Sequence, residues 1–165
     1  MKVGPNEHRV QHEMLAVGTS APDFTLTATD QSQRTLQTYN GKVKILSCVP
    51  SVDTSVCSAQ TRRFNQEAAA LGTDAIVIVT VSADLPFALR RYCTTEGIEN
   101  SETLSDHRTM QFADAYGVHD LDWRVLQRAV FVVDRENVVQ YAEYMPSIGE
   151  EVNFDAVLEK ARALV

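Results

Sequence analysis

The sequence predicts an α/β sandwich with a mixed central sheet, and three observations support this fold class. Residues 43–49 and 75–81 are continuous apolar runs, and the second is rich in β-branched residues, as strands covered on both faces of a sheet are. Between them, residues 54–71 carry apolar side chains at helical spacing. Strands and helices then alternate until an antiparallel pair and a last helix, an order that indicates helices packed on a mixed sheet.

The first third of the chain predicts a polar lead-in followed by strands. Residues 1 to about 20 are polar, and residues 24–27 then alternate like a half-buried strand. A short alternating piece at 34–38 and a turn at Asn40-Gly41 lead into the apolar run that begins at residue 43. We expect that run to be a central strand, paired in parallel with residues 75–81.

The second half of the chain predicts three more helices. Pro86 can start a helix that Gly97 can end, and Cys93 lies in the second half of that helix. The remaining expected elements are a short strand at 102–104, a helix from about 109 to 116, a hairpin-like pair of strands at 129–133 and 138–144, and a helix at 154–164 capped by Asn153.

Length and charge exclude several classes of protein. With 165 residues and 44% hydrophobic content, we expect one domain spanning residues 1–165. The net charge of −7 and the pI near 5.0 argue against nucleic acid or an anionic membrane surface as a partner, since both require a concentrated positive face. The chain shows no apolar run of membrane-spanning length and no apolar leader, so we predict a cytoplasmic protein.

The three cysteines favour chemistry over structural cross-linking. An odd count at low density is unlike a disulfide scaffold, and none of the spacings has the C-x-x-C form of a zinc site or of a disulfide oxidoreductase. Cys48 lies inside an apolar strand and is expected to be a core residue. Cys57 follows a strand and a polar turn, in the first turn of a predicted helix. Backbone N–H groups and the helix dipole stabilise a thiolate there, so we expect Cys57 to be a nucleophile. The alternative is that Cys57 is a buried residue that serves only as a small apolar side chain.

The motif around Cys57 resembles a known family. Pro50-Ser51-Val52-Asp53-Thr54-Ser55-Val56-Cys57, with residues 82–88 and Cys93 downstream, is similar to the thiol peroxidase branch of the peroxiredoxins. Supporting segments are residues 21–24, 104–108, 116–118 and 128–134, and the likeness runs from about Val17 to the C-terminus. The resemblance implies a thioredoxin-like three-layer sandwich with a possible N-terminal β-hairpin, a homodimer, and no cofactor or metal.

The resemblance also implies the roles of individual residues. Cys57 would be the peroxidatic nucleophile and Cys93 the resolving thiol that forms an intrachain disulfide with it. Thr54 and Arg128 would hold the sulfur and the peroxide, with hydrogen peroxide and organic hydroperoxides as substrates in antioxidant defence and thioredoxin as the reductant. Without the resemblance, Arg128 reads as a solvated charge at a strand end, and Cys93 reads equally well as an interior helix residue.

The chemistry requires the same residue types. Attack of a thiolate on a hydroperoxide spreads negative charge that a guanidinium such as Arg128 can stabilise. Thr54, one turn before Cys57, can place its hydroxyl beside the sulfur, and Pro50 can shape the pocket without offering a competing donor. The resulting sulfenic acid must meet a second thiol before it is oxidised further. Because a disulfide needs Cα atoms within about 7 Å, we expect one of the two cysteine-bearing helices to unwind locally.

Two features depart from the family pattern. Residues 4–10 are polar, so we expect residues 1–17 to form a polar lead-in or a weak hairpin, and Gln127 replaces a small residue. His8 and His12 could share a helix face and bind a metal, but no third ligand is evident at a suitable spacing and we expect both to be solvated. His107 and His119 show no cue for pairing with Cys57, which argues against a cysteine hydrolase.

Two alternatives to a peroxidase remain open at this stage. The same thiol chemistry could serve a peroxide sensor that passes oxidation to a partner. A thioredoxin-fold binding module with inert cysteines is the other alternative, and an unreactive Cys57 would favour it.

Overall fold

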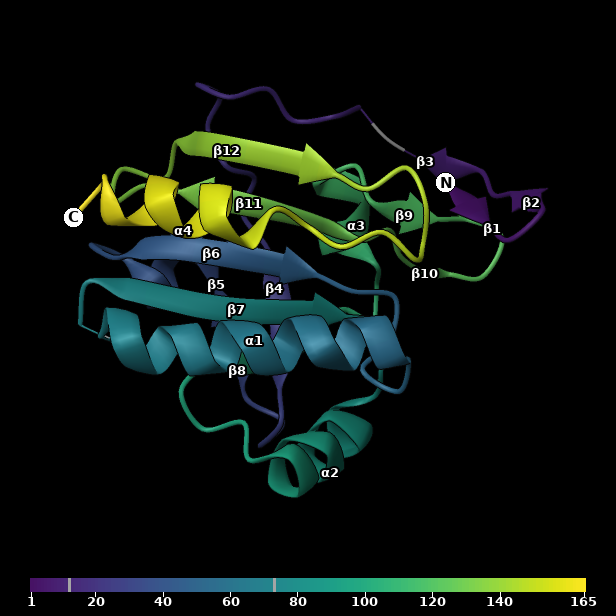
Figure 1. The fold of residues 1–165 in the computed structure, drawn as a ribbon, viewed down its shortest axis with the longest axis horizontal. Helices are drawn as coiled ribbons and strands as arrows, with labels where there is room; N and C mark the ends of the chain where they lie inside the picture. Colours follow the sequence, from purple (N-terminus) through teal and green to yellow (C-terminus); the bar gives the residue numbers. More distant parts are fainter. Residues whose placement is uncertain (12, 73) are drawn as a thin grey trace.

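The computed structural model describes residues 1–11, 13–72 and 74–165 and is built around a seven-stranded sheet. The strand order is β12-β11-β6-β7-β8-β4-β5 (Figure 1). The strands are β4 (Thr25–Ala28), β5 (Gln33–Thr35), β6 (Val43–Cys48), β7 (Ile76–Ser82), β8 (Glu102–Ser105), β11 (Ala129–Val133) and β12 (Val139–Tyr144). The helices are α1 (Ser55–Leu71), α2 (Pro86–Glu96), α3 (Gln111–Ala115) and α4 (Phe154–Arg162), with a 3-10 turn at Leu36–Tyr39.

The pairing of the strands confirms the predicted mixed sheet. β6 pairs in parallel with β7, and β7 pairs in parallel with β8. β11 is antiparallel to both β6 and β12, which confirms the hairpin-like pair expected near the C-terminus. The parallel centre follows from the long α1 crossover, because a tight turn cannot join parallel strands.

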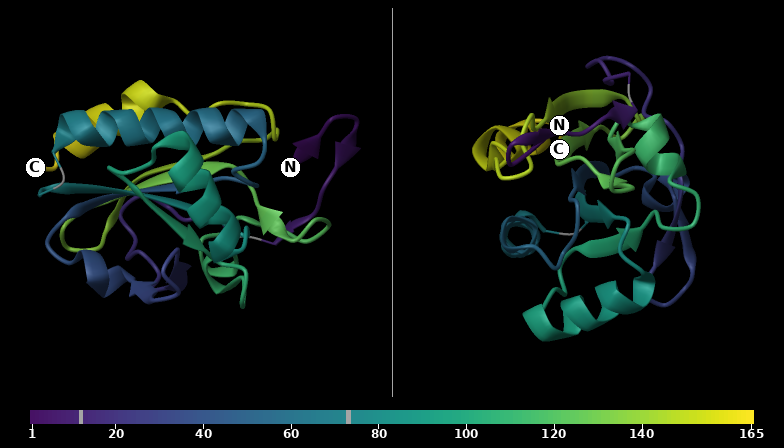
Figure 2. Two further views of the ribbon diagram at one scale, coloured as in Figure 1. Left: turned by 90° about the horizontal axis from the view of Figure 1, so that it is seen from below. Right: turned by 90° about the vertical axis from the view of Figure 1, so that its right-hand side faces the viewer.

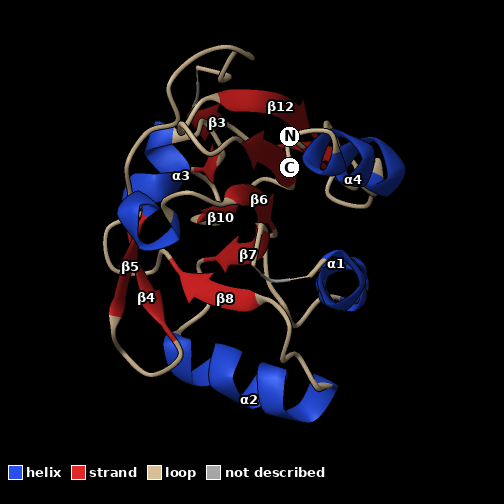
Figure 3. Ribbon diagram, turned by 90° about the vertical axis from the view of Figure 1, so that its left-hand side faces the viewer, coloured by secondary structure: helices blue, strands red, loops and turns tan. Residues whose placement is uncertain are grey.

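Two hydrophobic cores lie on opposite faces of this sheet, as the three-layer sandwich requires. On one face, α1 and α4 lie side by side over the central strands (Figure 3). Phe64 of α1 contacts Phe154 of α4 there, with ring centroids 5.1 Å apart. On the other face, α3 and the 3-10 turn cover the remaining residues, with Phe112 and Tyr116 stacked at 4.2 Å. Each central strand is therefore covered on both faces, which explains why its sequence is mainly hydrophobic.

Local signals fixed the ends of three helices. α1 begins directly after Thr54, and α2 runs from Pro86 to the residue before Gly97, whose φ of 66° is the left-handed conformation that glycine tolerates. The Asn153 side chain caps α4 by accepting the backbone N–H of Ala156 at 3.1 Å. The helix expected at 109–116 is shorter than predicted, because Met110 has a positive φ of 56° and the helix starts after it.

The N-terminal region is more ordered than the sequence suggested. β1 (Lys2–Val3) and β2 (Asn6–Glu7) form a two-stranded hairpin, so the weak hairpin that we expected is present in a short form. A small second sheet joins β3 (Val10–Gln11), β9 (His119–Asp120) and β10 (Val125–Leu126), and we did not predict it. Figure 2 shows the hairpin projecting beside the body of the molecule.

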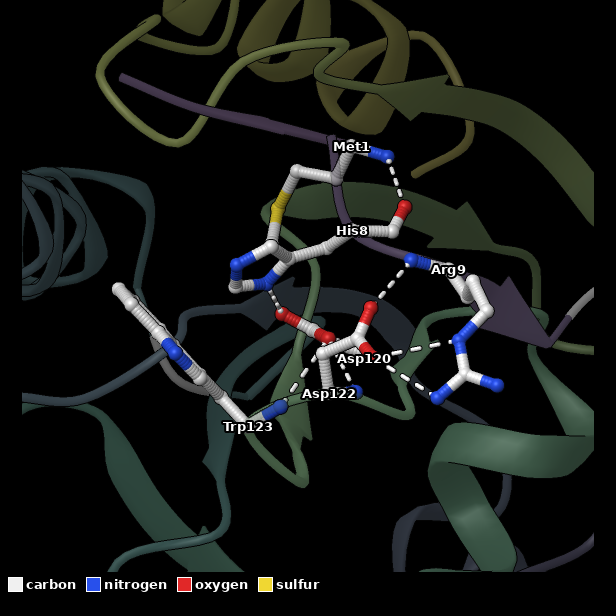
Figure 4. A network of polar contacts seen from close by, with 6 residues as sticks. All are labelled: Met1, His8, Arg9, Asp120, Asp122 and Trp123. Atoms are coloured by element: carbon white, nitrogen blue, oxygen red, sulfur yellow. Dashed lines mark hydrogen bonds and ion pairs between the residues drawn. The ribbon is translucent and has the colours of Figure 1, made fainter. Parts of the chain in front are cut away.

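The expectation that His8 is solvated was wrong. Its side chain is 8% exposed, and Nδ1 lies 2.6 Å from Oδ2 of Asp120, which is fully buried (Figure 4). The ring also meets Trp123 edge-on, with ring centroids 4.7 Å apart. The sequence could not reveal this pair because its members are 112 positions apart. His12 lies outside the described residues.

Among the helices of the described residues, none combines the length and the apolar character that crossing a lipid bilayer requires.

Candidate active site

Cys57 lies in the first turn of α1, at the end of the loop that leaves β6. Thr54 is the residue that precedes the helix, so Cys57 is its third residue, and the Cys57 side chain is fully buried. The first N–H groups of an α-helix have no acceptor within the helix, and they favour a negative charge beside them. The structure thus places this sulfur beside N–H groups of that kind and away from bulk water.

Arg128 approaches the same sulfur from the sheet. It directly precedes β11, and because β11 runs antiparallel to β6, the beginning of β11 meets the end of β6. Nη2 of Arg128 lies 3.3 Å from Sγ of Cys57, and the side chain is only 1% exposed. The expectation that Arg128 on its own reads as a solvated charge therefore does not hold in the folded chain.

Fixed acceptors hold the Arg128 guanidinium in place. Nη1 donates to Oε1 of Gln60 at 2.9 Å, and Nη2 donates to the carbonyl oxygen of Ile148 at 2.9 Å. Gln60 is itself fixed by a 2.8 Å hydrogen bond from its Nε2 to Oγ of Ser47 in β6. Nε of Arg128 is buried and has no hydrogen-bond partner among the described residues.

The contacts of Gln60 and Ile148 with Arg128 were not predicted from the sequence. Gln60 could have been found, because it lies three residues after Cys57 and hence on the same face of the helix. Ile148 acts through its backbone carbonyl, for which side-chain identity gives no signal.

Thr54 and Pro50 lie in the loop before Cys57 but differ in exposure. Pro50 is buried and lies two residues beyond the end of β6. Thr54 is exposed, and its hydroxyl donates to the carbonyl oxygen of Ser51 at 3.2 Å, so in this structure it braces the turn where we expected it to face the sulfur. The hydroxyl must rotate away from Ser51 before it can bind a thiolate or a peroxide.

Asp84 ties this loop to the end of β7. Its carboxylate accepts hydrogen bonds from the Ser51 hydroxyl at 2.8 Å and from the Val52 backbone N–H at 2.9 Å. The Ser82 hydroxyl donates to the same carboxylate at 2.8 Å. Asp84 belongs to the segment 82–88 that carried part of the family resemblance, and the structure gives that segment a physical role at the site.

Cys93 lies on α2 and is partly buried beside the same apolar cluster as Cys57. This cluster consists of Val49, Val52, Cys57, Leu89, Tyr92 and Ile98, with Cys93 packed against it. Sγ of Cys93 lies 3.0 Å from Oγ1 of Thr103 in β8. Burial raises the pKa of the Cys93 thiol, and the contact with Thr103 offsets part of that rise. All three cysteines are free thiols, so the structure represents the reduced form.

Polar contacts join α1 to α2 between the two cysteines. The Tyr92 hydroxyl donates to the Ser58 carbonyl oxygen at 3.1 Å and lies 3.1 Å from the Ser58 hydroxyl. One turn further along, Arg62 donates to the Ser58 hydroxyl at 2.6 Å and contacts Glu96 at 3.2 Å. Because Ser58 follows Cys57 and Tyr92 precedes Cys93, these contacts hold both thiols in their helices.

The other candidate residues lie elsewhere. Cys48 is fully buried in β6, and burial raises the pKa of its thiol well above the usual range. His107 contacts Ser105 at 2.9 Å, and His119 contacts Asp114 at 2.7 Å.

The comparisons with known proteins agree with this geometry. The Redoxin family model matches residues 16–158. A thiol peroxidase of Streptococcus pneumoniae (strain ATCC BAA-255 / R6) is 48% identical over 152 residues, which is 92% of each chain. One of Oceanobacillus iheyensis is 51% identical, covering 86% of this chain and 85% of its own. The crystal structure of a peroxiredoxin-like protein from Aquifex aeolicus superposes with a TM-score of 0.89 at 34% identity, covering 96% of this chain and 92% of the other.

The site has a buried cysteine at a helix start with an arginine against its sulfur, and it lies on a thioredoxin-like sheet. The sequence relatives, which match most of the chain, are thiol peroxidases and so agree with this site and fold. The chain belongs to the redoxin family, within the thiol peroxidase branch of the peroxiredoxins.

Proposed function

We propose that this chain reduces hydrogen peroxide and organic hydroperoxides with Cys57 as the nucleophile. The observation that carries the proposal is the 3.3 Å contact between Nη2 of Arg128 and Sγ of Cys57 inside a buried site. A guanidinium held there by Gln60 and Ile148 is a preorganised cation, and such groups are worth most where water is excluded. The names of the relatives, thiol peroxidases, support the same chemistry.

In the first step, the Cys57 thiolate attacks the terminal oxygen of the hydroperoxide. An S–O bond forms as the O–O bond breaks, and the leaving alkoxide or hydroxide takes up a proton to become an alcohol or water. The developing negative charge lies between the sulfur and the leaving oxygen, where Arg128 can share it through Nη2 and the unpartnered Nε. In this proposal, Thr54 contributes its hydroxyl once that group leaves Ser51, and Pro50 forms part of the wall.

In the second step, the Cys93 thiolate attacks the Cys57 sulfenic acid. A disulfide forms, hydroxide leaves as water, and Cys57 is protected from further oxidation. Both thiols are held within helices in the reduced form. Cys57 is fully buried, and Cys93 is hydrogen-bonded to Thr103. Local unwinding of α2 or of the first turn of α1 therefore precedes the disulfide.

We further propose that thioredoxin reduces the disulfide, that the chain works as a homodimer, and that it acts in the cytoplasm in antioxidant defence. Thioredoxin restores the enzyme by thiol–disulfide exchange, in which its thiolate attacks one sulfur and the other leaves as thiolate. The family membership of the chain supports a thiol reductant of this kind.

The test is to add one equivalent of cumene hydroperoxide to fully reduced protein, stop the reaction with a thiol alkylator, and map the cysteines by non-reducing peptide mass spectrometry. We expect a Cys57–Cys93 disulfide within seconds, with Cys48 alkylated only after unfolding. If peroxide leaves all three cysteines as reduced thiols that the alkylator can still label after unfolding, the proposal is overturned and a non-catalytic module with the same fold is favoured. A stable Cys57 sulfenic acid without the disulfide would retain the first step and refute the second.

A further inference from the structure

We propose that the N-terminal hairpin β1–β2 positions Arg128 for catalysis and that His8 locks the hairpin in place. The inference rests on the proposed role of Arg128 in peroxide reduction. Two sets of contacts carry it, one from the hairpin to the loop that holds the guanidinium and one from His8 to the strand pair that leads to Arg128. In Figure 1 the hairpin lies at the same end of the molecule as the start of α1.

The first set of contacts runs through the loop that joins β12 to α4. The carbonyl oxygen of Ile148 in this loop accepts the hydrogen bond from Nη2 of Arg128. The backbone N–H of Ile148 donates to the carbonyl oxygen of Lys2 at 3.0 Å, and that of Lys2 donates to the carbonyl oxygen of Pro146 at 2.8 Å. Lys2 and Ser147 thus form a parallel bridge, by which β1 fixes the residue that in turn fixes the catalytic guanidinium.

The hairpin needs an anchor because it has little core of its own. Each strand is only two residues long, and both residues of β2 are exposed. A two-stranded hairpin of this kind is at best marginally stable in water. Its position therefore depends on what holds it to the rest of the molecule.

His8 supplies that anchor directly after β2. Its backbone N–H donates to the carbonyl oxygen of Met1 at 2.8 Å, which closes the hairpin, while its ring pairs with Asp120 (Figure 4). The other oxygen of Asp120 accepts the backbone N–H groups of Asp122 at 2.9 Å and Trp123 at 3.3 Å. Asp120 belongs to β9, whose partner β10 ends at Leu126, two residues before Arg128.

The hydrogen bonds around His8 and Asp120 favour a structural attachment and argue against a metal site. Ligand atoms of His8, Asp120 and Asp122 lie within 4.8 Å of one another, a spacing that a cation could use. However, both oxygens of Asp122 already accept from Arg9, at 2.7 Å from its backbone N–H and 2.8 Å from Nη2. Both oxygens of Asp120 are also engaged, as described above. The carboxylate oxygens thus all have partners within the chain, and the burial of Asp120 makes the network a firm attachment.

The test compares His8→Ala with Arg9→Ala. Arg9 is adjacent, and its exposed ion pair with Asp122 lies in the same network but outside the buried His8–Asp120 pair, so it is a matched control. The readout is the second-order rate constant for cumene hydroperoxide with Cys57 in a single turnover, measured separately from disulfide formation. We expect His8→Ala to lower this constant by about 3- to 30-fold, because small misplacements of a catalytic group can cost up to about 100-fold. Arg9→Ala should leave it within about 2-fold.

A double-mutant cycle distinguishes positioning from general destabilisation. In the Arg128→Lys background, His8→Ala should cause no further loss, because the two changes remove the same interaction. A variant that lacks residues 1–3 deletes β1 while retaining His8 and should reproduce the loss, and it serves if His8→Ala does not fold. An unchanged peroxide rate constant in a folded His8→Ala protein, or a loss that persists in full beside Arg128→Lys, would overturn the inference. If wild-type protein does not react with peroxide at all, the proposed function fails instead.

Discussion

The two cysteines of the proposed reaction lie against one apolar cluster, yet they differ in burial and in the groups packed around them. Cys57 is fully buried at the junction of β6, α1 and β11, with Arg128 and Gln60 fixed around it. Cys93 is partly buried on α2, whose contacts with α1 are the apolar cluster and a few hydrogen bonds around Tyr92. Figure 3 shows α2 at one end of the molecule, away from the sheet face that α1 and α4 share.

This difference suggests how one chain can serve two chemical steps. In the proposed first step, fixed charges stabilise the transition state of the attack on peroxide. The residues proposed for this step lie at the ends of the central strands and at the start of α1. In the proposed second step, disulfide formation requires a change of backbone, and we expect local unwinding of α2, at the periphery of the molecule, to supply it. The predictions below test this contrast, beginning with the largest effect.

Replacement of Cys57 should abolish peroxidase turnover. Cys57→Ser removes the thiol that lies against Arg128, and a hydroxyl is not ionised at neutral pH. A coupled thioredoxin assay should show no activity above background. The control is Cys48→Ala, a buried change in β6 that should cost about 1 kcal/mol of stability and retain turnover. Substantial turnover in Cys57→Ser would show that Cys57 is not the nucleophile that attacks the peroxide.

Replacement of Cys93 should separate the two steps. In Cys93→Ser the first reaction with peroxide should keep its wild-type rate constant, because Arg128 and Gln60 are untouched. Recycling by thioredoxin should be lost, and mass spectrometry should find Cys57 progressively converted to sulfinic acid. A disulfide between Cys57 and Cys48 in this variant would contradict the view that the central strands stay fixed.

Arg128→Lys should slow the reaction with peroxide by about 100-fold or more, because removal of one preorganised donor costs about 2.7–4 kcal/mol. Lysine keeps the charge, but its single nitrogen cannot reproduce the forked contacts with Cys57, Gln60 and Ile148. Stopped-flow measurement of the first turnover provides the test. A loss as small as that from Arg63→Ala, which breaks an exposed ion pair between α1 and α4, would show that charge alone suffices.

Tyr92→Phe should accelerate disulfide formation. The variant loses the hydrogen bond from the Tyr92 hydroxyl to the Ser58 carbonyl, worth about 0.5–1.5 kcal/mol, so the unwound state becomes about 2- to 10-fold more accessible. Timed alkylation after one equivalent of peroxide measures the rate. Thr94→Ala removes a hydrogen bond within α2 and leaves its contacts with α1, so it is the matched control. An unchanged rate in Tyr92→Phe would mean that α2 does not limit the second step.

Alkylation of Cys93 in the reduced protein should show a shifted pH profile. Burial raises the pKa of this thiol, and only the thiolate reacts, so at neutral pH iodoacetamide should modify Cys93 more slowly than it modifies a free thiol. The rate should rise as the pH rises into the alkaline range. In urea, where burial is lost, the difference should disappear. A folded-state profile identical to that in urea would show that α2 is already open in the reduced form.

The sequence by itself determined the elements that depend on neighbouring residues. Apolar runs located the central strands, Pro86 and Gly97 bounded α2, and Asn153 started α4. Cys57 could be singled out as a candidate nucleophile because its position at a helix start is a local property, and the motif of the family pointed to the same residue. Such signals act over one or two turns of chain, so they can be read without knowing the fold.

Only the tertiary structure decided which distant groups meet. Arg128 and Cys57 are 71 positions apart, His8 and Asp120 are 112 apart, and Ile148 contributes a carbonyl that every residue type possesses. The orientation of the Thr54 hydroxyl toward Ser51 likewise depends on how the loop packs against Asp84. These contacts follow from the strand order and the crossover connections. A buried polar group without a hydrogen bond is costly, so its partner is whichever suitable group the fold places next to it.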